Sequence, residues 1–328
     1  NILAATSGDT GSAAIYGVRG KNRIKIFVMH PHGRVSPTQE RQMTSVLDDN
    51  VFNIAADGTF DDCQRVMKNI FRNAEFKRQY ALGAVNSVNW ARVLAQIVYY
   101  FYAGLRVMKS ESCECVSFSV PTGNFGDILA GYYAARMGLP VERLILATNE
   151  NDILSRFFNT GVYALGTVVP TLRPSMDIPV ASNFERYLYY RTGENPARIR
   201  ATMNEFEHTG RLSVEHTGER IDPLFAAGSA NTPQTLDVIR SFYNNHGYLL
   251  DPHTATGVHV ARELKHNETP VICLATAHPA KFGKAIAEAL GRDLAHHPLL
   301  DSLADVPTRC ARLPANEAVI QNYIRQNA

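Results

Sequence analysis

The chain of 328 residues has nearly balanced charge, with 33 lysine and arginine residues, 31 aspartate and glutamate residues and a formal net charge of +2. A composition of 45% hydrophobic and 20% charged residues is typical of a soluble globular chain that is long enough for two cores. No basic stripe or acidic tail indicates a nucleic acid or a membrane as partner. No apolar run approaches the roughly 18 residues that span a bilayer, and no signal-peptide pattern opens the chain, so we expect a cytoplasmic protein that acts on a small molecule.

The first part of the chain alternates between strand-like and helix-like segments, as in βαβ units. We predict strands over residues 1–6, 24–31 and 51–56, and helices from about Ser12, from about Pro37 and over residues 60–71. In the last of these helices, apolar side chains recur at helical spacing on one face. They are Phe60, Cys63, Met67, Ile70 and Phe71.

The strand at the start, NILAA, has the apolar composition of a buried strand in the middle of a sheet, which is a poor place for a natural chain to begin. We therefore expect that a natural segment before Asn1 is absent from this sequence.

A second alternation follows. We predict a long apolar helix over residues 90–105, a strand over 115–123, a helix from about Asp127 and a strand over 142–149. Between about Asn151 and Gly247 the alternation of strands and helices becomes less regular. It resumes in segments 251–265, 270–279 and 281–291. The predicted fold class is α/β, with two open twisted parallel sheets and flanking helices. We expect a smaller domain over 1–95, truncated at its N-terminus, and a larger one over 96–328 with an insertion at about 155–250.

Neither the cysteines nor the histidines indicate a metal site. The cysteines are odd in number and only two are close together, so we interpret them as reduced thiols: Cys63, Cys113, Cys115, Cys273 and Cys310. The candidate histidines show no i, i+4 pairing and no cysteine support, which makes a metalloenzyme the weakest alternative. They are His30, His32, His278, His296 and His297.

Open parallel sheets bind ligands beyond the carboxyl ends of their strands, so loops that follow strands are the first places to look for a site. Residues 6–11 (TSGDTG) bring hydroxyls, a carboxylate and glycines to a predicted helix start, where free N–H groups favour an anion such as a substrate carboxylate. Simple capping of that helix by Ser7, Asp9 or Thr10 is the alternative, and it is the more common explanation for such a loop taken alone.

Two further loops follow strands. The glycines of residues 122–127 (TGNFGD) let the backbone wrap a phosphate, although an ordinary glycine turn is an alternative. This loop lacks the lysine of a P-loop and the glycine spacing of a dinucleotide fingerprint, so neither ATP nor NAD is indicated. The second of these loops contains Thr276, His278 and Lys281. A turn fixed by Pro279 is the alternative explanation for its residues.

A fourth segment joins polar side chains to a helix start. Asn86, Ser87 and Asn89 lead into a helix that carries Arg92. An amide, a hydroxyl and a guanidinium within one turn can bind an oxyanion, because arginine supplies planar bidentate donors. Capping of the helix together with a surface arginine is the alternative.

The motifs TSGDTG, NSVNWAR, PTGNFGD and TAHPAKF, taken together and in this order, resemble those of the threonine synthase family. The resemblance covers nearly the whole chain, including ATNENDIL, PSMDI and DPHTATGV. It implies a lyase of threonine biosynthesis that depends on pyridoxal 5'-phosphate (PLP) and has fold type II, the tryptophan synthase β-like fold. The implied reaction converts O-phospho-L-homoserine and water into L-threonine and phosphate by γ-elimination and β-addition.

The resemblance also implies roles for individual residues. The ring nitrogen of PLP would meet Thr276, and its 3'-oxygen would meet Asp9. The PLP phosphate would be bound by the loop Gly123, Asn124, Phe125, Gly126 and Asp127. The substrate carboxylate and reacting carbons would meet Thr6, Ser7, Gly8 and Thr10, of which Thr10 is the catalytic candidate. The substrate phosphate would be bound by Asn86, Ser87 and Arg92.

The lysine that binds PLP covalently lies before the TSGDTG loop in this family, and no lysine of this chain matches it. Lys281 matches a different lysine of the family. We therefore expect residues 1–328 alone to be inactive.

Other functions stay open at this point. A related phospholyase would release 2-oxobutyrate, and a protein that lost its lysine would only bind a phosphate ligand. The sequence does not resolve the oligomeric state, and a monomer is the favoured expectation.

Overall fold

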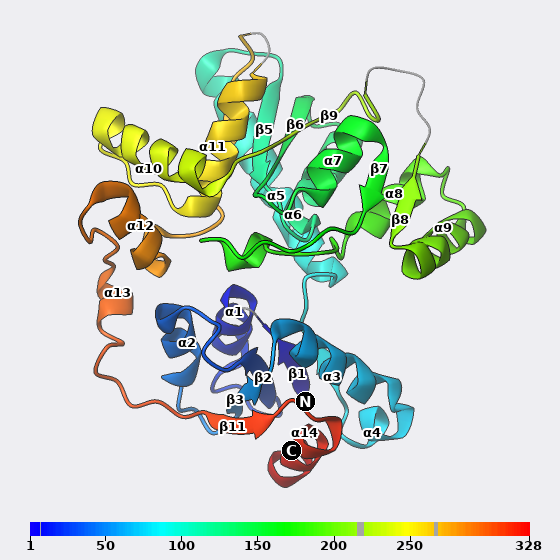
Figure 1. Ribbon diagram of the computed structural model, residues 1–328, viewed down its shortest axis with the longest axis vertical. Coiled ribbons are helices and arrows are strands. Elements are labelled where there is room, and N and C mark those ends of the chain that lie inside the picture. Colours follow the sequence, from blue (N-terminus) through cyan, green and yellow to red (C-terminus); the bar gives the residue numbers. More distant parts are fainter. Residues whose placement is uncertain (7, 215–219, 266–267) are drawn as a thin grey trace. The chain divides into compact units, whose positions relative to one another are not determined.

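The computed structural model describes residues 1–6, 8–214, 220–265 and 268–328. These residues form two compact units (Figure 1). Unit 1 comprises Asn1–Asn86 and His296–Ala328, and unit 2 comprises Ser87–Ala295. The sequence analysis placed 96–328 in one domain, and this differs from the structure at the C-terminus. Residues 296–328 belong with unit 1, because strand β11 (Ala311–Pro314) pairs with strand β3 (Val51–Asp57).

The sheet of unit 1 is parallel, with strand order β11-β3-β2-β1-β4. Its remaining strands are β1 (Ile2–Ala5), β2 (Ile26–Pro31) and β4 (Gly83–Ala84). Strand β1 pairs with β2 on one side and with β4 on the other. The prediction that the chain starts with a strand inside a sheet is therefore confirmed.

Helices cover both faces of this sheet (Figure 1). They are α1 (Asp9–Val18), α2 (Pro37–Thr44), α3 (Phe60–Arg72), α4 (Ala74–Gln79) and α14 (Glu317–Asn327). The short helix α13 (Pro298–Asp301) also belongs to unit 1, and none of its residues is buried. Helix α3 buries Cys63, Met67 and Ile70, as the spacing predicts, in a core that also contains Leu3 and Phe27. On the other side, helices α1 and α2 pack on β2. Strand β2 is buried along its whole length for this reason.

The main sheet of unit 2 is also parallel, with strand order β10-β5-β6-β9. The strands are β5 (Val116–Pro121), β6 (Val141–Thr148), β9 (Phe225–Ser229) and β10 (Val271–Cys273). Strand β9 lies inside the region that the sequence analysis treated as an insertion, where no strand was predicted. Its sequence, FAAGS, has no β-branched residue, and its pairing with β6 defines it as a strand.

The long apolar helix predicted over 90–105 is α5 (Trp90–Glu111), which packs on α6 (Gly126–Arg136). The other helices of unit 2 are α7 (Ile153–Thr160), η1 (Pro174–Met176), α8 (Phe184–Arg191), α9 (Pro196–Thr209), α10 (Thr232–His246), α11 (Pro252–Leu264), η2 (Pro279–Lys281) and α12 (Gly283–Leu290). A small antiparallel pair consists of β7 (Val162–Ala164) and β8 (Arg211–Ser213).

The contact between α5 and α6 depends on a glycine. A Cβ atom on Gly131 would lie 2.5 Å from Cε1 of the fully buried Tyr100 and 3.0 Å from Cδ2 of Leu144. We expect Gly131→Ala to lower the free energy of unfolding by about 1 to 3 kcal/mol, the usual effect of overpacking a core. Urea unfolding measures this loss. Gly17→Ala is the control, because a Cβ there meets nothing within 4 Å, and equal stability of the two variants would contradict the expectation.

Candidate active site

Two candidate loops of unit 1 follow neighbouring parallel strands. Thr6 and residues 8–10 come after β1 and Asn86 comes after β4, and Ile2 and Leu3 of β1 pair with Gly83 and Ala84 of β4. Since the carboxyl ends of parallel strands meet at one edge of a sheet, the two loops lie at the same edge. Ser7, one of the predicted substrate-binding residues, lies outside the described residues.

Thr6 shapes the first of these loops. Its side chain is buried, and its Oγ1 accepts hydrogen bonds from the main-chain N–H of Gly8 at 3.0 Å and of Gly11 at 2.9 Å. Gly8 is the N-cap of α1, at a φ of 142° that favours glycine, and it provides no side-chain cap. Asp9 and Thr10 lie in the first turn, so neither is the N-cap that the alternative interpretation required.

Two candidate loops of unit 2 likewise follow neighbouring parallel strands. Residues 123–127 come after β5, and Thr276 comes after β10. The pairing continues to the ends of the strands, where Leu274 N donates to Ser119 O at 2.9 Å. The residues predicted to bind the cofactor phosphate and the ring nitrogen therefore lie at one edge of one sheet.

The start of helix α6 fits a phosphate group. Its N-cap, Phe125, has a left-handed backbone with φ 62° and provides no side-chain cap. The N–H groups of the first turn of a helix have no acceptor within the helix, and the dipole there is positive, so this end suits an anion.

The ring of Phe125 holds that backbone in place. It is buried among aromatic rings, with centroid distances between 5.6 and 6.1 Å. These rings belong to Phe158, Phe184, Tyr187 and Phe225. A left-handed conformation costs an L-residue about 1 to 2 kcal/mol, and burial of a phenylalanine side chain offsets it with about 1.5 to 3 kcal/mol.

Arg92 and Asp127 bring the predicted substrate-phosphate segment close to this loop. Arg92 is exposed in the first turn of α5, where Asn89 caps the helix by accepting a hydrogen bond from Ala91 N at 3.0 Å. Burial raises the pKa of Asp127 to about 6, while a hydrogen bond from Tyr100 and the charge of Arg92 lower it. The hydroxyl of Tyr100 donates to Asp127 O at 2.8 Å. Segment 87–92 and loop 123–127 are thus neighbours within unit 2.

The raised pKa of Asp127 predicts a pH dependence of stability. Between pH 4 and 6 the folded state holds a proton on this carboxyl that the unfolded state releases, so the free energy of unfolding falls as pH rises through this window. Two pKa units correspond to about 3 kcal/mol. We expect Asp127→Asn to remove this part of the slope in urea unfolding between pH 3.5 and 7. Asp237→Asn, at an exposed position of α10, is the control, and identical slopes in both variants would contradict the assignment.

Sequence reasoning missed a segment that packs on the loop after β5. A Cβ on Gly123 would lie 2.8 Å from Ser175 O, and a Cβ on Gly126 would lie 3.3 Å from Asn183 Nδ2. The glycines therefore make room for residues 175–183 of the chain. The motif PSMDI at 174–178 is one of the motifs that resemble the family, but no role was assigned to it. It was the signal in the sequence that could have pointed to this segment.

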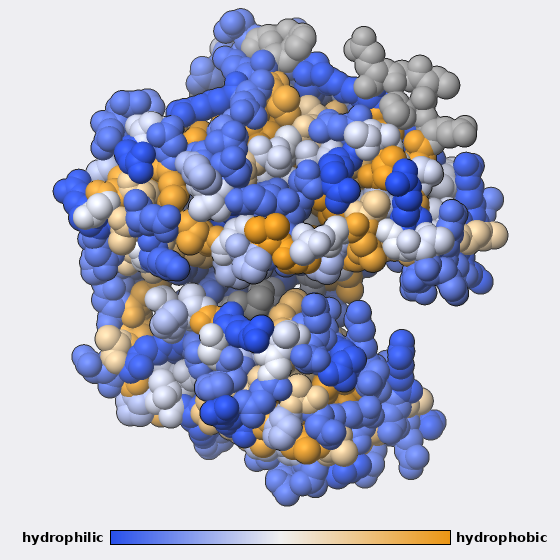
Figure 2. Space-filling view, in the orientation of Figure 1, coloured by the Kyte–Doolittle hydropathy of each residue, from blue (hydrophilic) through white to orange (hydrophobic). Residues whose placement is uncertain are grey.

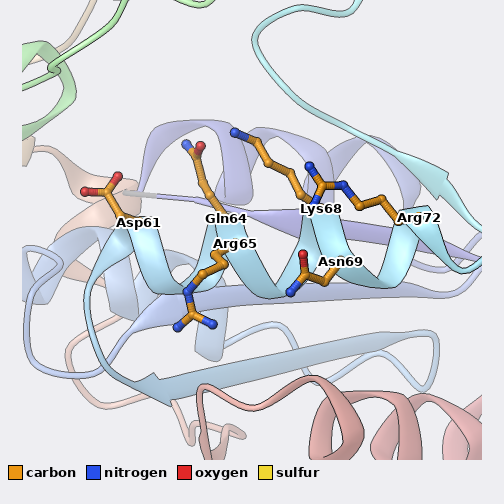
Figure 3. Close-up of a pocket in the computed structure, with 6 residues that line it drawn as sticks. All are labelled: Asp61, Gln64, Arg65, Lys68, Asn69 and Arg72. Atoms are coloured by element: carbon orange, nitrogen blue, oxygen red, sulfur yellow. The ribbon is translucent and has the colours of Figure 1, made fainter. Parts of the chain in front are cut away.

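Two pockets lie apart from the candidate residues. One runs along the exposed side of α3, where Figure 3 shows the lining side chains projecting from successive turns of that single helix. They are Asp61, Gln64, Arg65, Lys68, Asn69 and Arg72. The other, of about 700 Å³, lies against α10, α11 and β10 and is mainly apolar, with Phe242, Tyr248 and Val271 in its lining. No residue of the predicted site lines either pocket.

The described part of the chain contains no helix that is long and apolar enough to cross a membrane. In the same residues, no group of three or more His, Cys, Asp or Glu side chains is arranged to hold a metal ion. The five cysteines form no disulfide, and burial raises the pKa of Cys63 and Cys273 to about 11, so these two thiols stay protonated at neutral pH. On the face drawn in Figure 2, hydrophilic side chains cover most of each unit, with apolar groups between them.

The open parallel sheets and the loops that follow their strands define the class of protein, which is fold type II of the PLP-dependent enzymes. Residues 254–324 match the family model described as threonine synthase, C-terminal. The threonine synthase of Pseudomonas aeruginosa is 48% identical over 99% of this chain and 70% of its own length. That of Schizosaccharomyces pombe is 49% identical over 88% of this chain and 61% of its own length.

A crystal structure of PLP-bound threonine synthase from Brucella melitensis matches with a TM-score of 0.91 at 44% identity, over 99% of this chain and 70% of that one. The chain belongs to the threonine synthase family, and this similarity supports threonine synthase as its function. The predicted family and fold class are confirmed. The chain spans about 60 to 70% of the length of the curated synthases that it matches.

Proposed function

We propose that the protein, with PLP as cofactor, converts O-phospho-L-homoserine and water into L-threonine and phosphate. The observation that carries this proposal is the 48% identity to the Pseudomonas aeruginosa enzyme over nearly the whole chain. The four motifs that would bind cofactor and substrate are all present in the chain.

The cofactor phosphate is bound by Gly123, Asn124, Phe125, Gly126 and Asp127 at the start of α6. The uncapped helix end and the rigid backbone at Phe125 support this role. When bound, PLP supplies a conjugated ring that accepts electrons while protons leave and return at successive substrate carbons.

The rest of the ring is recognised from two strand ends. Thr276, after β10, offers a neutral hydroxyl to the ring nitrogen, and such a partner does not favour a proton on that nitrogen as a carboxylate would. Asp9, in the first turn of α1, contacts the 3'-oxygen.

The substrate is held at both of its charged ends. Asn86, Ser87 and Arg92 bind its phosphate, with the guanidinium of Arg92 as a bidentate donor. The loop after β1 binds its carboxylate and presents hydroxyls to the reacting carbons through Thr6, Ser7, Gly8 and Thr10. Thr10 is the catalytic residue and transfers protons at the reacting carbons. The hydrogen bonds that Thr6 accepts fix the conformation of the loop.

Assembly and location are part of the same proposal. We assign the protein to the cytoplasm as a monomer. One observation weighs against the monomer, namely a row of exposed apolar side chains along α5, between 46% and 63% exposed, at spacings of three and four residues: Trp90, Leu94, Val98, Tyr102 and Leu105. Sedimentation of the intact protein tests this part, and a dimer would overturn it.

The reaction itself is tested by product analysis. The intact protein is loaded with PLP and incubated with O-phospho-L-homoserine, and threonine, 2-oxobutyrate and phosphate are measured together. Threonine and phosphate in equal amounts support the proposal. Phosphate with 2-oxobutyrate would make the protein a phospholyase, and PLP binding without phosphate release would make it a binding protein.

A further inference from the structure

A buried asparagine joins the two loops that are assigned to the two phosphates. Asn183 is 0% exposed and stands at the N-terminus of α8. Its Nδ2 donates to Ser87 O at 3.0 Å and to Asn124 O at 3.1 Å. Its main-chain N–H also donates to Asn124 O, at 3.1 Å. One side chain therefore bonds to the main chain of the substrate-phosphate segment and to that of the cofactor-phosphate loop.

The residues on either side of Asn183 strengthen this link. The hydroxyl of Ser182 lies 3.0 Å from Ser87 Oγ and donates to Asn124 Oδ1 at 3.1 Å. Arg186 donates to Asn183 Oδ1 at 2.5 Å and to Val88 O at 2.6 Å. The guanidinium thus fixes the orientation of the amide, since Oδ1 faces a donor and Nδ2 faces two carbonyl oxygens.

Packing leaves this connection little freedom. Phe184, the residue after Asn183, lies edge-on to Phe125 with ring centroids 5.6 Å apart. Gly126 also lies close to the amide, because a Cβ there would be 3.3 Å from Nδ2. Residues 87–88, 124–126 and 182–186 are therefore held as one group, although they are far apart in the sequence.

We infer that Asn183 is a positioning residue that sets the spacing between the cofactor phosphate and the substrate phosphate. The inference rests on the proposed function, because that function assigns the two phosphates. The side-chain amide of Asn183 donates hydrogen bonds to a carbonyl oxygen of each of the two loops. In the proposed function, each loop binds a different phosphate, so the distance between the loops sets the distance between the phosphates. A shift of about 1 Å between reacting groups can cost a factor of 100 in rate.

The test compares Asn183→Asp, which keeps the shape and replaces the donor by an acceptor, with Asn53→Asp. Asn53 is also buried, and its amide donates to Met43 O at 2.9 Å within unit 1, so it is a matched control. Hydrogen exchange of peptides that cover residues 84–93 and 121–130 is measured without ligand. The Kd of PLP and the kcat and KM for O-phospho-L-homoserine are then measured for the intact protein.

For Asn183→Asp we expect faster exchange in both peptides, a PLP Kd raised at least fivefold and a KM raised about tenfold or more. For Asn53→Asp we expect none of these three changes. If Asn183→Asp does not fold, Arg186→Gln serves as the second variant, because it removes the donor to Asn183 Oδ1 and to Val88 O.

An active wild-type protein whose Asn183→Asp form has unchanged Kd and KM would overturn the inference, as would changes equal to those of Asn53→Asp. A wild-type protein that binds PLP and forms no threonine would instead contradict the proposed function, so the two failures are distinguishable.

Discussion

Replacement of Arg92 by lysine is expected to lower kcat/KM for O-phospho-L-homoserine about 10- to 100-fold and to leave PLP affinity unchanged. Lysine keeps the positive charge near Asp127 and loses the planar pair of donors that matches a phosphate. The loss of charge-assisted hydrogen bonds of this kind corresponds to about 1.5 to 3 kcal/mol. Because Arg92 is exposed in the first turn of α5, the exchange disturbs no core packing.

Arg200→Lys, on the exposed side of α9, is the control for this result. Steady-state kinetics with a titration of PLP separates the two effects. A kcat/KM equal to that of the control would remove Arg92 from the substrate-phosphate site, and a large loss of PLP affinity would place it at the cofactor.

Gly123→Ala is expected to weaken PLP binding at least tenfold. The new Cβ would lie 2.8 Å from Ser175 O and 3.4 Å from Met176 Cα, and both are main-chain atoms, so no side chain can turn aside to make room. The loop must move away from residues 174–176, and its N–H groups move with it. The free energy of unfolding should also fall by about 1 to 3 kcal/mol.

Two other glycines calibrate this expectation. Gly126→Ala should have a smaller effect, because its Cβ would meet the side-chain amide of Asn183 at 3.3 Å. Gly166→Ala should have none, since its nearest neighbour is a guanidinium nitrogen of Arg156 at 3.6 Å. Fluorescence titration with PLP measures all three variants. Equal affinities would show that the loop after β5 tolerates the shift or does not bind the phosphate.

Local patterns in the sequence were enough for much of this structure. The spacing of apolar residues predicts α3 and its buried face, and the apolar runs predict β1, β2, β3, β5 and β6. The polar loops after β1, β5 and β10 could be chosen in advance because parallel strands end at a common edge. These predictions depend on neighbours in sequence and on a rule that holds for all such sheets.

What the sequence did not reveal depends on contacts between distant residues. Strand β9 has a composition of small residues, and strand β11 joins unit 1 through pairing with β3 more than 250 residues earlier. From the sequence alone, Asn183 would be interpreted as an ordinary polar residue before a helix. Its hydrogen-bond partners Ser87 and Asn124 lie 96 and 59 residues away in the sequence. Thr6 was assigned to the substrate, while its hydroxyl also organises the start of α1. No local pattern contains such information.

The most direct test of the proposed site is a crystal structure of the intact protein with PLP and a phosphonate analogue of O-phospho-L-homoserine. We expect the PLP phosphate within hydrogen-bond distance of main-chain N–H groups of residues 123–127. We also expect the phosphonate within hydrogen-bond distance of Ser87 and Arg92. A PLP phosphate bound away from the start of α6, or a phosphonate with no contact to Arg92, would contradict the assignment of the two loops.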